Sequence, residues 1–495
     1  MRRGPDVAAR ISARETASKR VGRAASLVLA LVALAGCASR PINAPLVEAD
    51  RRAGYRYENR AERPDNDPST VVVLAFSGGG MRAAAFSYGV LEELRGLEVT
   101  LNGRRTSLLD EVDLITGVSG GSFTALAYGL YGEKLFGDYE RRFLKRDVQR
   151  ELIARLFAPR NWGALMSGSW GRSEMASELY DDLLFEGKTY AELMTRQGPM
   201  IMASATDIST GSRLAFSQAE FDLICSDLAS VPLARAAAAS SAVPLVMSPV
   251  TLNNYGGSCG YEPPFWVREF ESPDNRLRPA GRAMQRIREM HAFQDGAHRP
   301  FLHLVDGGLA DNLGLRAILE SLEEIEASRA LRRSTRVARI ERVAVFVVNS
   351  LSVPRIEWDQ SERPPNDVQI LLKATGVPID RYSFEGVELL RDIVARWNTI
   401  RGLRDAGDLD GATNRPLARV VDVPDIELFA IDVSIQAHPD VAERRFLNET
   451  PTSWSLSGEQ VDRLRAAPAA ILGASAEFAR LLRDLAASHA QPVAR

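Results

Sequence analysis

A serine in a glycine-rich turn is the first candidate for chemistry in this chain. Residues 117–121 read Gly-Val-Ser-Gly-Gly, which fits the pattern Gly-x-Ser-x-Gly. The turn lies between a short apolar segment, 112–116, and an apolar helical pattern, 122–131. Between a strand and a helix, such a turn exposes the serine oxygen beside the helix N-terminus, where backbone dipoles favour negative charge. The spacing predicts that Ser119 is the nucleophile of an acyl transfer, although glycine and serine are also common in ordinary turns.

A second glycine-rich turn directly follows the apolar segment 71–76. Its residues are Ser77, Gly78, Gly79, Gly80, Met81 and Arg82. Successive glycines let backbone N–H groups converge on an anion, as in a phosphate cradle or an oxyanion hole. The Gly-Lys-Ser/Thr end of a Walker loop is absent, and Ala83 stands where a Rossmann fingerprint needs its third glycine. With a serine nucleophile in the next strand–turn–helix unit, an oxyanion hole is the simplest interpretation.

A carboxylate follows a third predicted strand, 301–305, in the sequence Asp306-Gly307-Gly308. Asp306 could orient or activate the serine hydroxyl. The alternative is a plain turn, because Asp-Gly is a frequent turn sequence.

No histidine is well placed to complete a Ser-His-Asp triad. The chain has five histidines, which are His291, His298, His303, His438 and His489. His303 is nearest in sequence to Asp306, but side chains three positions apart on a strand point to opposite faces. The sequence therefore favours a base other than histidine without excluding one.

The elements around these turns indicate an α/β fold. Strands are predicted from short β-branched apolar runs at 71–76, 112–116, 200–205, 301–305, 343–349 and 426–433. Helices are predicted at 83–95, 122–131, 138–157, 173–185, 228–241, 312–327, 385–402 and 455–488. Strand–turn–helix units with uninterrupted apolar strands are typical of a mostly parallel sheet that helices cover.

Composition and charge exclude several other classes of protein. The chain of 495 residues is 45% apolar and 25% charged, which are ordinary globular proportions. It is neither a disordered chain nor a small disulfide scaffold. Its formal net charge of −3 lacks the basic excess of a nucleic-acid-binding protein. No Cys-x-x-Cys or His-x-x-x-His pattern occurs, so neither a metal site nor another cofactor is predicted.

Taken together, the three turns resemble the motifs of the patatin-like phospholipase family and occur in the same order. The matching residues are Gly78, Gly79, Gly80, Met81 and Arg82, then Gly117, Ser119, Gly120 and Gly121, then Asp306, Gly307 and Gly308. The segment 239–244, Ala-Ser-Ser-Ala-Val-Pro, is a further family-like block. The resemblance covers about 71–315 and departs from the family pattern at Ala83, where glycine is frequent.

The resemblance implies a fold, a dyad and an activity. The fold is a three-layer α/β/α arrangement with a mostly parallel central sheet. Ser119 is the implied nucleophile and Asp306 the implied base, with no histidine in the chemistry. The implied oxyanion donors are the amides of Gly78, Gly79, Gly80, Met81 and Gly120. The implied reaction is hydrolysis of phospholipid or lysophospholipid esters through an acyl-enzyme.

Two other functions stay open at this point. One is an esterase or thioesterase that acts on smaller acyl substrates, and the other is a non-catalytic lipid-binding lipoprotein. Arg82 could support its loop, meet a lipid phosphate or form a surface ion pair. The segment 263–267, Pro-Pro-Phe-Trp-Val, either enters a lipid surface or packs beneath the surrounding insertion.

The N-terminus predicts export and a lipid anchor. Residues 1–36 carry seven basic and two acidic side chains, and their apolar run, 24–36, is too short to span a bilayer. The run ends in Leu-Ala-Gly before Cys37, which resembles the lipobox of bacterial lipoproteins. In those proteins the cysteine is acylated and the leader is removed. Ala38 resembles lipoproteins of the outer membrane. We therefore expect a lipid-anchored protein of the bacterial cell envelope, with a plain signal peptide as the alternative.

The remaining cysteines are Cys225 and Cys259, which could pair in an oxidising compartment or stay as buried thiols. Four parts of the chain are expected. They are a signal peptide (1–36), a lipid anchor with a flexible tether (37–70), a catalytic domain (71–350) with an insertion at about 255–300, and a mixed helical C-terminal extension (351–495) packed on the core.

Overall fold

The computed structural model describes residues 39–487, with internal gaps. The gaps are 61–62, 64–65, 102, 272–280, 328, 334–335, 354–357, 408 and 410–421. The predicted signal peptide, Cys37 and His489 lie outside the described residues.

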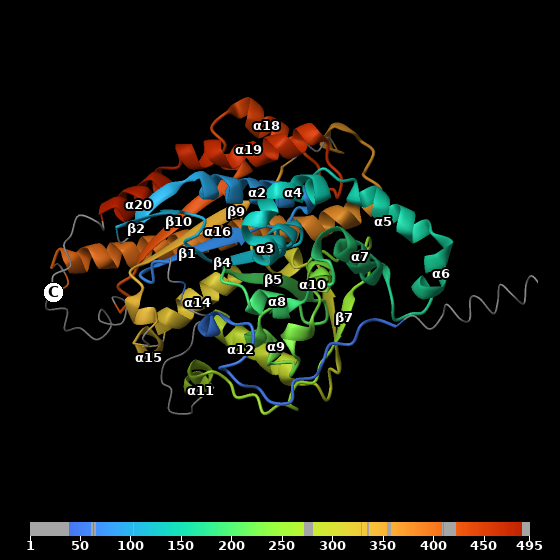
Figure 1. Cartoon of the computed structure of the whole chain (residues 1–495), viewed down its shortest axis with the longest axis horizontal. Coiled ribbons are helices and arrows are strands. Elements are labelled where there is room, and N and C mark those ends of the chain that lie inside the picture. The colour runs from blue at the N-terminus through green and yellow to red at the C-terminus, as the bar shows by residue number, and fades with distance from the viewer. Residues whose placement is uncertain are drawn as a thin grey trace, which may run out of the picture.

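A central sheet organises the described part of the chain and contains eight strands (Figure 1). Their order is β10-β9-β1-β4-β5-β8-β7, and β6 pairs with β5. The strands are β1 Thr70–Phe76, β4 Val112–Val118, β5 Met200–Asp207, β6 Arg213–Ala215, β7 Val250–Asn253, β8 Phe301–Val305, β9 Arg342–Asn349 and β10 Glu427–Ser434. The strands from β10 to β5 are parallel to one another. Strands β6 and β8 pair antiparallel with β5, and β7 pairs antiparallel with β8. The predicted α/β class with a mostly parallel sheet is confirmed.

Helices cover both faces of this sheet, because alternate side chains of a strand point to opposite sides. Leu74 and Phe76 of β1 pack in one core with α2 (Gly80–Gly96), α3 (Gly120–Tyr131), α19 (Gly458–Ala474) and α20 (Ala476–Ala487). Val73 and Ala75 pack in the other core with α14 (Arg316–Ala327) and α16 (Asp367–Asp405). The arrangement has the three layers that the sequence predicts (Figure 1).

The remaining helices cover the strand ends and the edge around β7. They are α4 Leu135–Tyr139, α5 Val148–Phe157, α6 Pro159–Leu165, α7 Arg172–Tyr180, α8 Tyr190–Met194, α9 Gln218–Phe221, α10 Leu233–Ser240, α11 Phe265–Glu271, α12 Gly281–Gln294, α13 Gly308–Asp311, α15 Arg329–Arg332 and α18 Val441–Glu449. A hairpin of β2 (Glu98–Leu101) and β3 (Arg104–Ser107) follows α2. In the described part of the chain, no helix combines the length and the apolar character needed to cross a bilayer.

The region after residue 350 is part of the core layers. Strand β10 pairs with β9 along its whole length, and α16 and α19 cover opposite faces of the sheet. Helix α16 is much longer than the predicted helix, 385–402, because it begins at an Asn366 capping box with Gln369. The expected extension therefore adds a strand to the sheet as well as packing on it.

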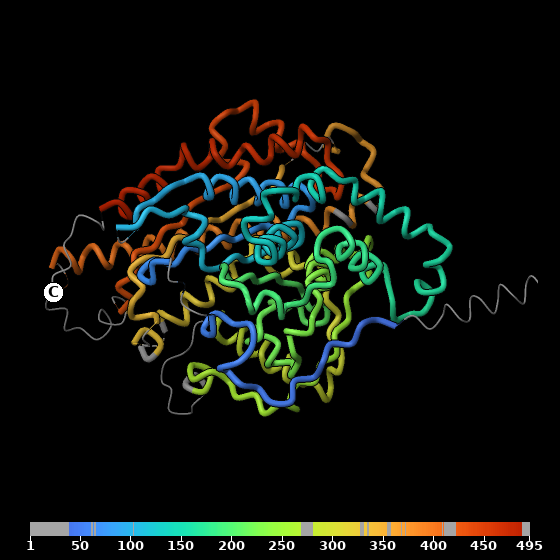
Figure 2. The backbone as a smooth tube through the Cα atoms, in the orientation of Figure 1, coloured from blue at the N-terminus to red at the C-terminus, as the bar shows by residue number. Residues whose placement is uncertain are grey.

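The segment from residue 39 to residue 60 packs against the protein, where the sequence predicts a flexible tether. The Leu46 N–H donates to the Cys225 carbonyl at 2.7 Å, and Pro45 forms a bridge with Ser226. Arg56 forms a buried ion pair with Asp222 at 2.8 Å. A charged and proline-rich composition suggested a tether, but buried side chains within it fix this segment across the molecule (Figure 2).

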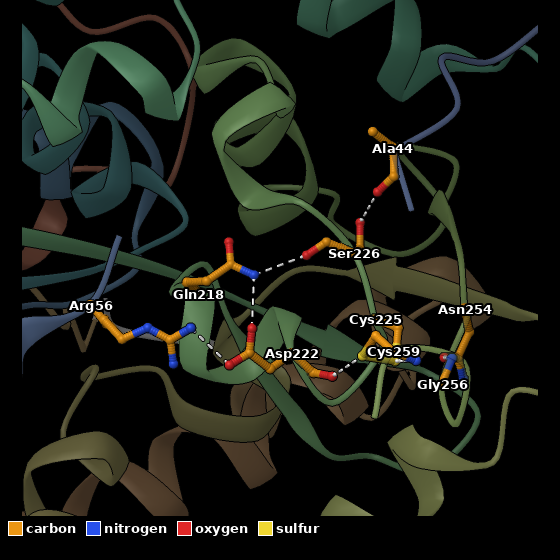
Figure 3. The surroundings of a disulfide bond; sticks show 9 residues. All are labelled: Ala44, Arg56, Gln218, Asp222, Cys225, Ser226, Asn254, Gly256 and Cys259. Carbon is orange, nitrogen blue, oxygen red and sulfur yellow. Dashed lines mark hydrogen bonds and ion pairs between the residues drawn. A yellow bond between two sulfur atoms is a disulfide. The ribbon is translucent and has the colours of Figure 1, made fainter. Parts of the chain in front are cut away.

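Cys225 and Cys259 form a disulfide beneath this N-terminal segment (Figure 3). Their Cα atoms lie 5.5 Å apart, within the usual range for a bridged pair. The bridge ties the loop after α9 to the start of the predicted insertion, and Asp222 beside it also accepts from Gln218 at 3.0 Å. The insertion itself contains helix α12, which its charged and irregular sequence does not predict.

Candidate active site

The side chains of Ser119 and Asp306 meet at one edge of the sheet. The Ser119 hydroxyl donates to Asp306 Oδ2 at 2.8 Å. Ser119 follows β4, and Asp306 follows β8, two strands away in the sheet. Because β8 is antiparallel to β5, its end returns beside Ser204, which is the register partner of Val118. The structure thus brings together the two residues that the sequence selects as nucleophile and base.

The backbone of Ser119 adopts the strained geometry of a nucleophile elbow, with φ 48° and ψ −120°. Few residues with a side chain adopt positive φ, so the surrounding contacts must enforce it. A Cβ at Gly117 would lie 2.8 Å from the Ser122 Cα, and one at Gly121 would lie 2.6 Å from the Ser77 carbonyl oxygen. At Gly120 a Cβ would collide with the Gly80 carbonyl. Close packing of the two turns therefore requires Gly120 and Gly121, whereas packing against the start of α3 requires Gly117.

The first glycine turn offers fewer free amides than the sequence suggests. The Gly78 N–H donates to the Asn312 carbonyl at 2.9 Å, and the Met81 N–H donates to the Ser453 carbonyl at 2.8 Å. Among the described residues, no acceptor is recorded for the N–H groups of Gly79, Gly80 or Gly120. These three amides, rather than all five predicted ones, are available to an oxyanion beside Ser119.

Asp306 is a buried carboxylate with few hydrogen-bond donors. It is 8% exposed, its Oδ1 accepts from the Gly308 N–H at 2.8 Å, and its Oδ2 accepts from Ser119. Burial raises the pKa of Asp306 to about 6, and the hydrogen bonds from Gly308 and Ser119 oppose that rise. A carboxylate with a pKa near neutrality is a better general base than an ordinary aspartate, so the environment suits proton abstraction from Ser119.

The C-terminus of α10 holds both residues in place. The Ser240 hydroxyl accepts from the Ser119 N–H at 2.9 Å and donates to the Ser204 carbonyl at 2.7 Å. The Ala242 carbonyl accepts from the Asp306 N–H at 3.0 Å. These residues belong to the family-like block 239–244, to which the sequence assigns no role. The only sign of this role in the sequence is the pair of serines at the end of the predicted helix, and such serines also occur at ordinary helix ends.

Arg82 supports the glycine turn from inside the protein. Its side chain is buried, its Nε donates to the Ser350 carbonyl at 2.7 Å, and its Nη1 donates to the Thr450 carbonyl at 2.8 Å. Burial lowers the pKa of Arg82 to about 10. Of the three roles considered for Arg82, loop support is the one that these contacts match. Ser453, three residues after Thr450, accepts from Met81, so the C-terminal region fixes the turn at two points.

Three of the described histidines have hydrogen-bond partners outside the pair. His298 contacts Asp295 at 2.8 Å, His303 contacts Thr251 at 3.0 Å, and His438 lies beside the Asp440 backbone. Within the described residues, the hydrogen-bond donors to the Asp306 carboxylate are the Ser119 hydroxyl and the backbone N–H of Gly308. The same part of the chain contains no cluster of histidine, cysteine and carboxylate side chains that could hold a metal ion.

Comparisons with known proteins agree with the motifs. The family model for patatin-like phospholipases matches residues 74–319. Human GIVD cytosolic phospholipase A2 is a similar solved structure, with 14% identity and a TM-score of 0.38, covering 87% of this chain and 64% of its own. The complex of the same enzyme with methyl gamma-linolenyl fluorophosphonate and terbium chloride also has 14% identity and a TM-score of 0.38. The match covers 88% of this chain and 61% of that chain. This chain thus spans less than two thirds of those chains. A search of curated proteins finds no match.

We predict that the raised pKa of Asp306 governs both activity and stability. If ionised Asp306 is the base, kcat/KM falls about tenfold for each pH unit below about 6.

Because the folded pKa of Asp306 lies above the ordinary 3.8, its ionisation destabilises the fold between about pH 4 and 6, and this loss of stability persists at higher pH. Asp306→Asn should therefore lose activity yet gain about 2–3 kcal/mol of unfolding free energy at pH 8 and little at pH 3. Urea unfolding at both pH values measures this, and an activity midpoint near pH 4 would contradict it.

We also predict that Ser240 positions the nucleophile. Ser240→Ala leaves the buried Ser119 N–H without its acceptor, which costs about 1–3 kcal/mol and should lower kcat about 10- to 100-fold. KM and the pH midpoint should stay unchanged, because the substrate site and the contacts of Asp306 are untouched. Ser241→Ala is the matched control, since its hydroxyl donates to Ala237 within the same helix. Equal losses in both variants would indicate a merely structural role.

Proposed function

Since the chain belongs to the patatin-like phospholipase family through residues 74–319, we propose that it is a lipid acyl hydrolase. Its substrates are phospholipids or lysophospholipids, and Ser119 and Asp306 form the catalytic dyad. The observation that carries this proposal is the hydrogen bond of 2.8 Å from the Ser119 hydroxyl to the buried Asp306 carboxylate. A preformed pair beside three unoccupied amides is more than a lipid-binding scaffold requires.

The first half of the reaction forms an acyl-enzyme. The Ser119 oxygen attacks the ester carbonyl carbon while its proton passes to Asp306 Oδ2. The oxyanion of the tetrahedral intermediate accepts hydrogen bonds from the free amides of Gly79, Gly80 and Gly120, and each such donor is typically worth about 10²–10³ in rate. When the intermediate collapses, the leaving alkoxide takes the proton from Asp306 and departs as an alcohol.

The second half repeats the same steps with water. Asp306, again ionised, takes a proton from a water molecule that attacks the acyl carbon. Collapse of the second intermediate releases the fatty acid, and the proton returns to the Ser119 oxygen. The carboxylate thus serves as base and then as acid in each half, which the raised pKa of Asp306 allows near neutral pH.

We predict that lipid hydrolysis depends on both residues and on no histidine. Ser119→Ala and Asp306→Asn should each lower hydrolysis of phosphatidylcholine and lysophosphatidylcholine by about 10⁴-fold or more, and the double variant should be little worse. His291→Gln, His298→Gln and His303→Gln are the controls and should keep most activity. Liberated fatty acid is measured across a panel that includes a short-chain ester. Activity on the short ester alone would point to a small-substrate esterase, and a histidine variant that is folded but inactive would replace the dyad by a triad.

We further propose that the protein is an envelope lipoprotein with its acyl anchor at Cys37. The apolar leader that ends in Leu-Ala-Gly-Cys supports this location, and so does the Cys225–Cys259 disulfide, because such bonds persist in oxidising compartments.

One non-reducing peptide map of the mature protein tests both features. We expect an N-terminal peptide that begins at an acylated Cys37 and a linked pair of peptides that contain Cys225 and Cys259. Cys37→Ser should release the protein from membranes or leave it unprocessed. A mature N-terminus elsewhere contradicts the anchor, and two free thiols in freshly isolated protein contradict the bridge.

A further inference from the structure

Helices α5 and α6 project from one end of the molecule (Figure 1), and large apolar side chains on and beside them are exposed. Phe157 is 69% exposed, Trp162 is 54% exposed and Met166 is 79% exposed. Helix α5 buries Val148 and Leu152 on its inner side, so its outer side is not needed for the core. Three large apolar side chains within ten residues form more than a scattered surface feature.

A second exposed apolar stretch lies between α10 and β7. Leu245 and Val246 are both exposed, and Leu245 has a left-handed backbone, with φ 71°. This loop begins directly after Ala242, whose carbonyl accepts from the Asp306 N–H. Further along it, Ser248 contacts Ser173 at the start of α7, where the Ser173 N–H donates to the Ser248 hydroxyl at 3.1 Å. The loop is therefore in contact both with the dyad and with the segment that follows α6.

We name these five side chains, Phe157, Trp162, Met166, Leu245 and Val246, the apolar rim. Between Leu152 and Ser173 the chain carries Arg155, Arg160 and Arg172 and no acidic residue, although Arg155 pairs with Asp182. Apolar side chains flanked by arginines complement the surface of a bilayer that contains anionic lipids.

The N-terminal segment enters close to the rim. The Arg40 Nη1 donates to the Thr251 carbonyl at 3.1 Å, and Arg235 donates to the same carbonyl while it pairs with Glu174 of α7. Only two residues separate Cys37 from Arg40. They can span roughly 10 Å, so an anchor at Cys37 would hold this side of the protein against the leaflet.

We propose that the apolar rim docks on an anionic phospholipid bilayer and so presents the Ser119–Asp306 edge to the membrane. This proposal rests on the proposed function, because it assumes that the substrate lies in that membrane. The alternative apolar segment, 263–267, is a poorer candidate, since Trp266 packs against the protein core although Phe265 is exposed.

Tryptophan quenching by brominated lipids tests the docking directly. The full chain with Ser119→Ala is mixed with vesicles of phosphatidylcholine and phosphatidylglycerol whose phosphatidylcholine carries bromine on its acyl chains. The first 60 residues contain no tryptophan, so the leader and anchor cannot contribute to the signal. We expect quenching, and we expect Trp162→Phe to lower it at least twofold. Trp397→Phe, at a fully buried position, is the matched control and should change nothing.

The same measurement can overturn the proposal. If Trp266→Phe rather than Trp162→Phe removes the quenching, the membrane contacts segment 263–267 and the assigned surface is wrong. If the chain shows no vesicle-dependent quenching, or if pure phosphatidylcholine vesicles quench equally, the commitment to an anionic bilayer fails. Because the assay uses an inactive variant, each result holds whether or not the proposed hydrolysis is correct.

A kinetic comparison connects the rim with turnover. In the active chain, Met166→Glu with Val246→Glu should lower the ratio of vesicle-lipid hydrolysis to short-ester hydrolysis at least tenfold. Val441→Glu, an exposed position on α18, is the matched control. An unchanged ratio in the rim variant contradicts the proposal. If the unsubstituted chain hydrolyses neither the vesicle lipid nor the short ester, the proposed function is wrong.

Discussion

The contact between the two glycine turns is the constraint on which the site depends. Gly120 lies so close to the Gly80 carbonyl that no side chain fits at position 120, and a Cβ at Gly121 would also lie too close, 2.6 Å from the Ser77 carbonyl oxygen. This approach brings the N-terminus of α3, which carries Ser119, against the N-terminus of α2. The N-termini of both helices, with their unpaired amides and positive dipole ends, therefore lie beside Ser119, where they would favour negative charge. Any displacement of either helix would open the contact and separate the nucleophile from its oxyanion donors.

Residues beyond the matched family region maintain this contact. The family match ends at residue 319, yet the carbonyls of Ser350, Thr450 and Ser453 hold Arg82 and the Met81 amide. Trp454 then packs edge-on against Phe123 of α3, with ring centroids 4.9 Å apart. One short C-terminal segment therefore touches both helices that meet at the site. The folded unit that carries Ser119 therefore includes the C-terminal third of the chain, which completes the sheet with β10 and fixes the glycine turn.

The sequence predicts the local parts of this arrangement better than the distant ones. Strands such as 71–76 and 112–116 are uniform apolar runs, and their turns have distinctive glycine patterns, so these strands and turns could be inferred from the sequence. The Gly78 and Met81 amides donate hydrogen bonds to the carbonyls of Asn312 and Ser453, which are far away in the chain. No local sequence pattern predicts these two bonds. Likewise, the segment 39–60 has the composition of a tether, but Arg56 finds a buried partner in Asp222. The sequence does not predict helix α12, because its three buried apolar residues, Ile287, Met290 and Phe293, stand among many charged ones.

The small number of hydrogen bonds to Asp306 suits the role of base that we propose for it. An ordinary aspartate is too weak a base, and burial must raise its pKa by an amount equivalent to about 3 kcal/mol to bring it to about 6. Every donor to the carboxylate works against this rise, and an arginine or protonated histidine beside it would do so most strongly. In this structure one oxygen accepts from the Gly308 amide, which orients the group, and the other accepts from Ser119, which is the proton it must take. A third donor would hold the carboxylate more firmly and make it a poorer base, so a carboxylate with these two donors fits the proton transfer that we propose for Asp306.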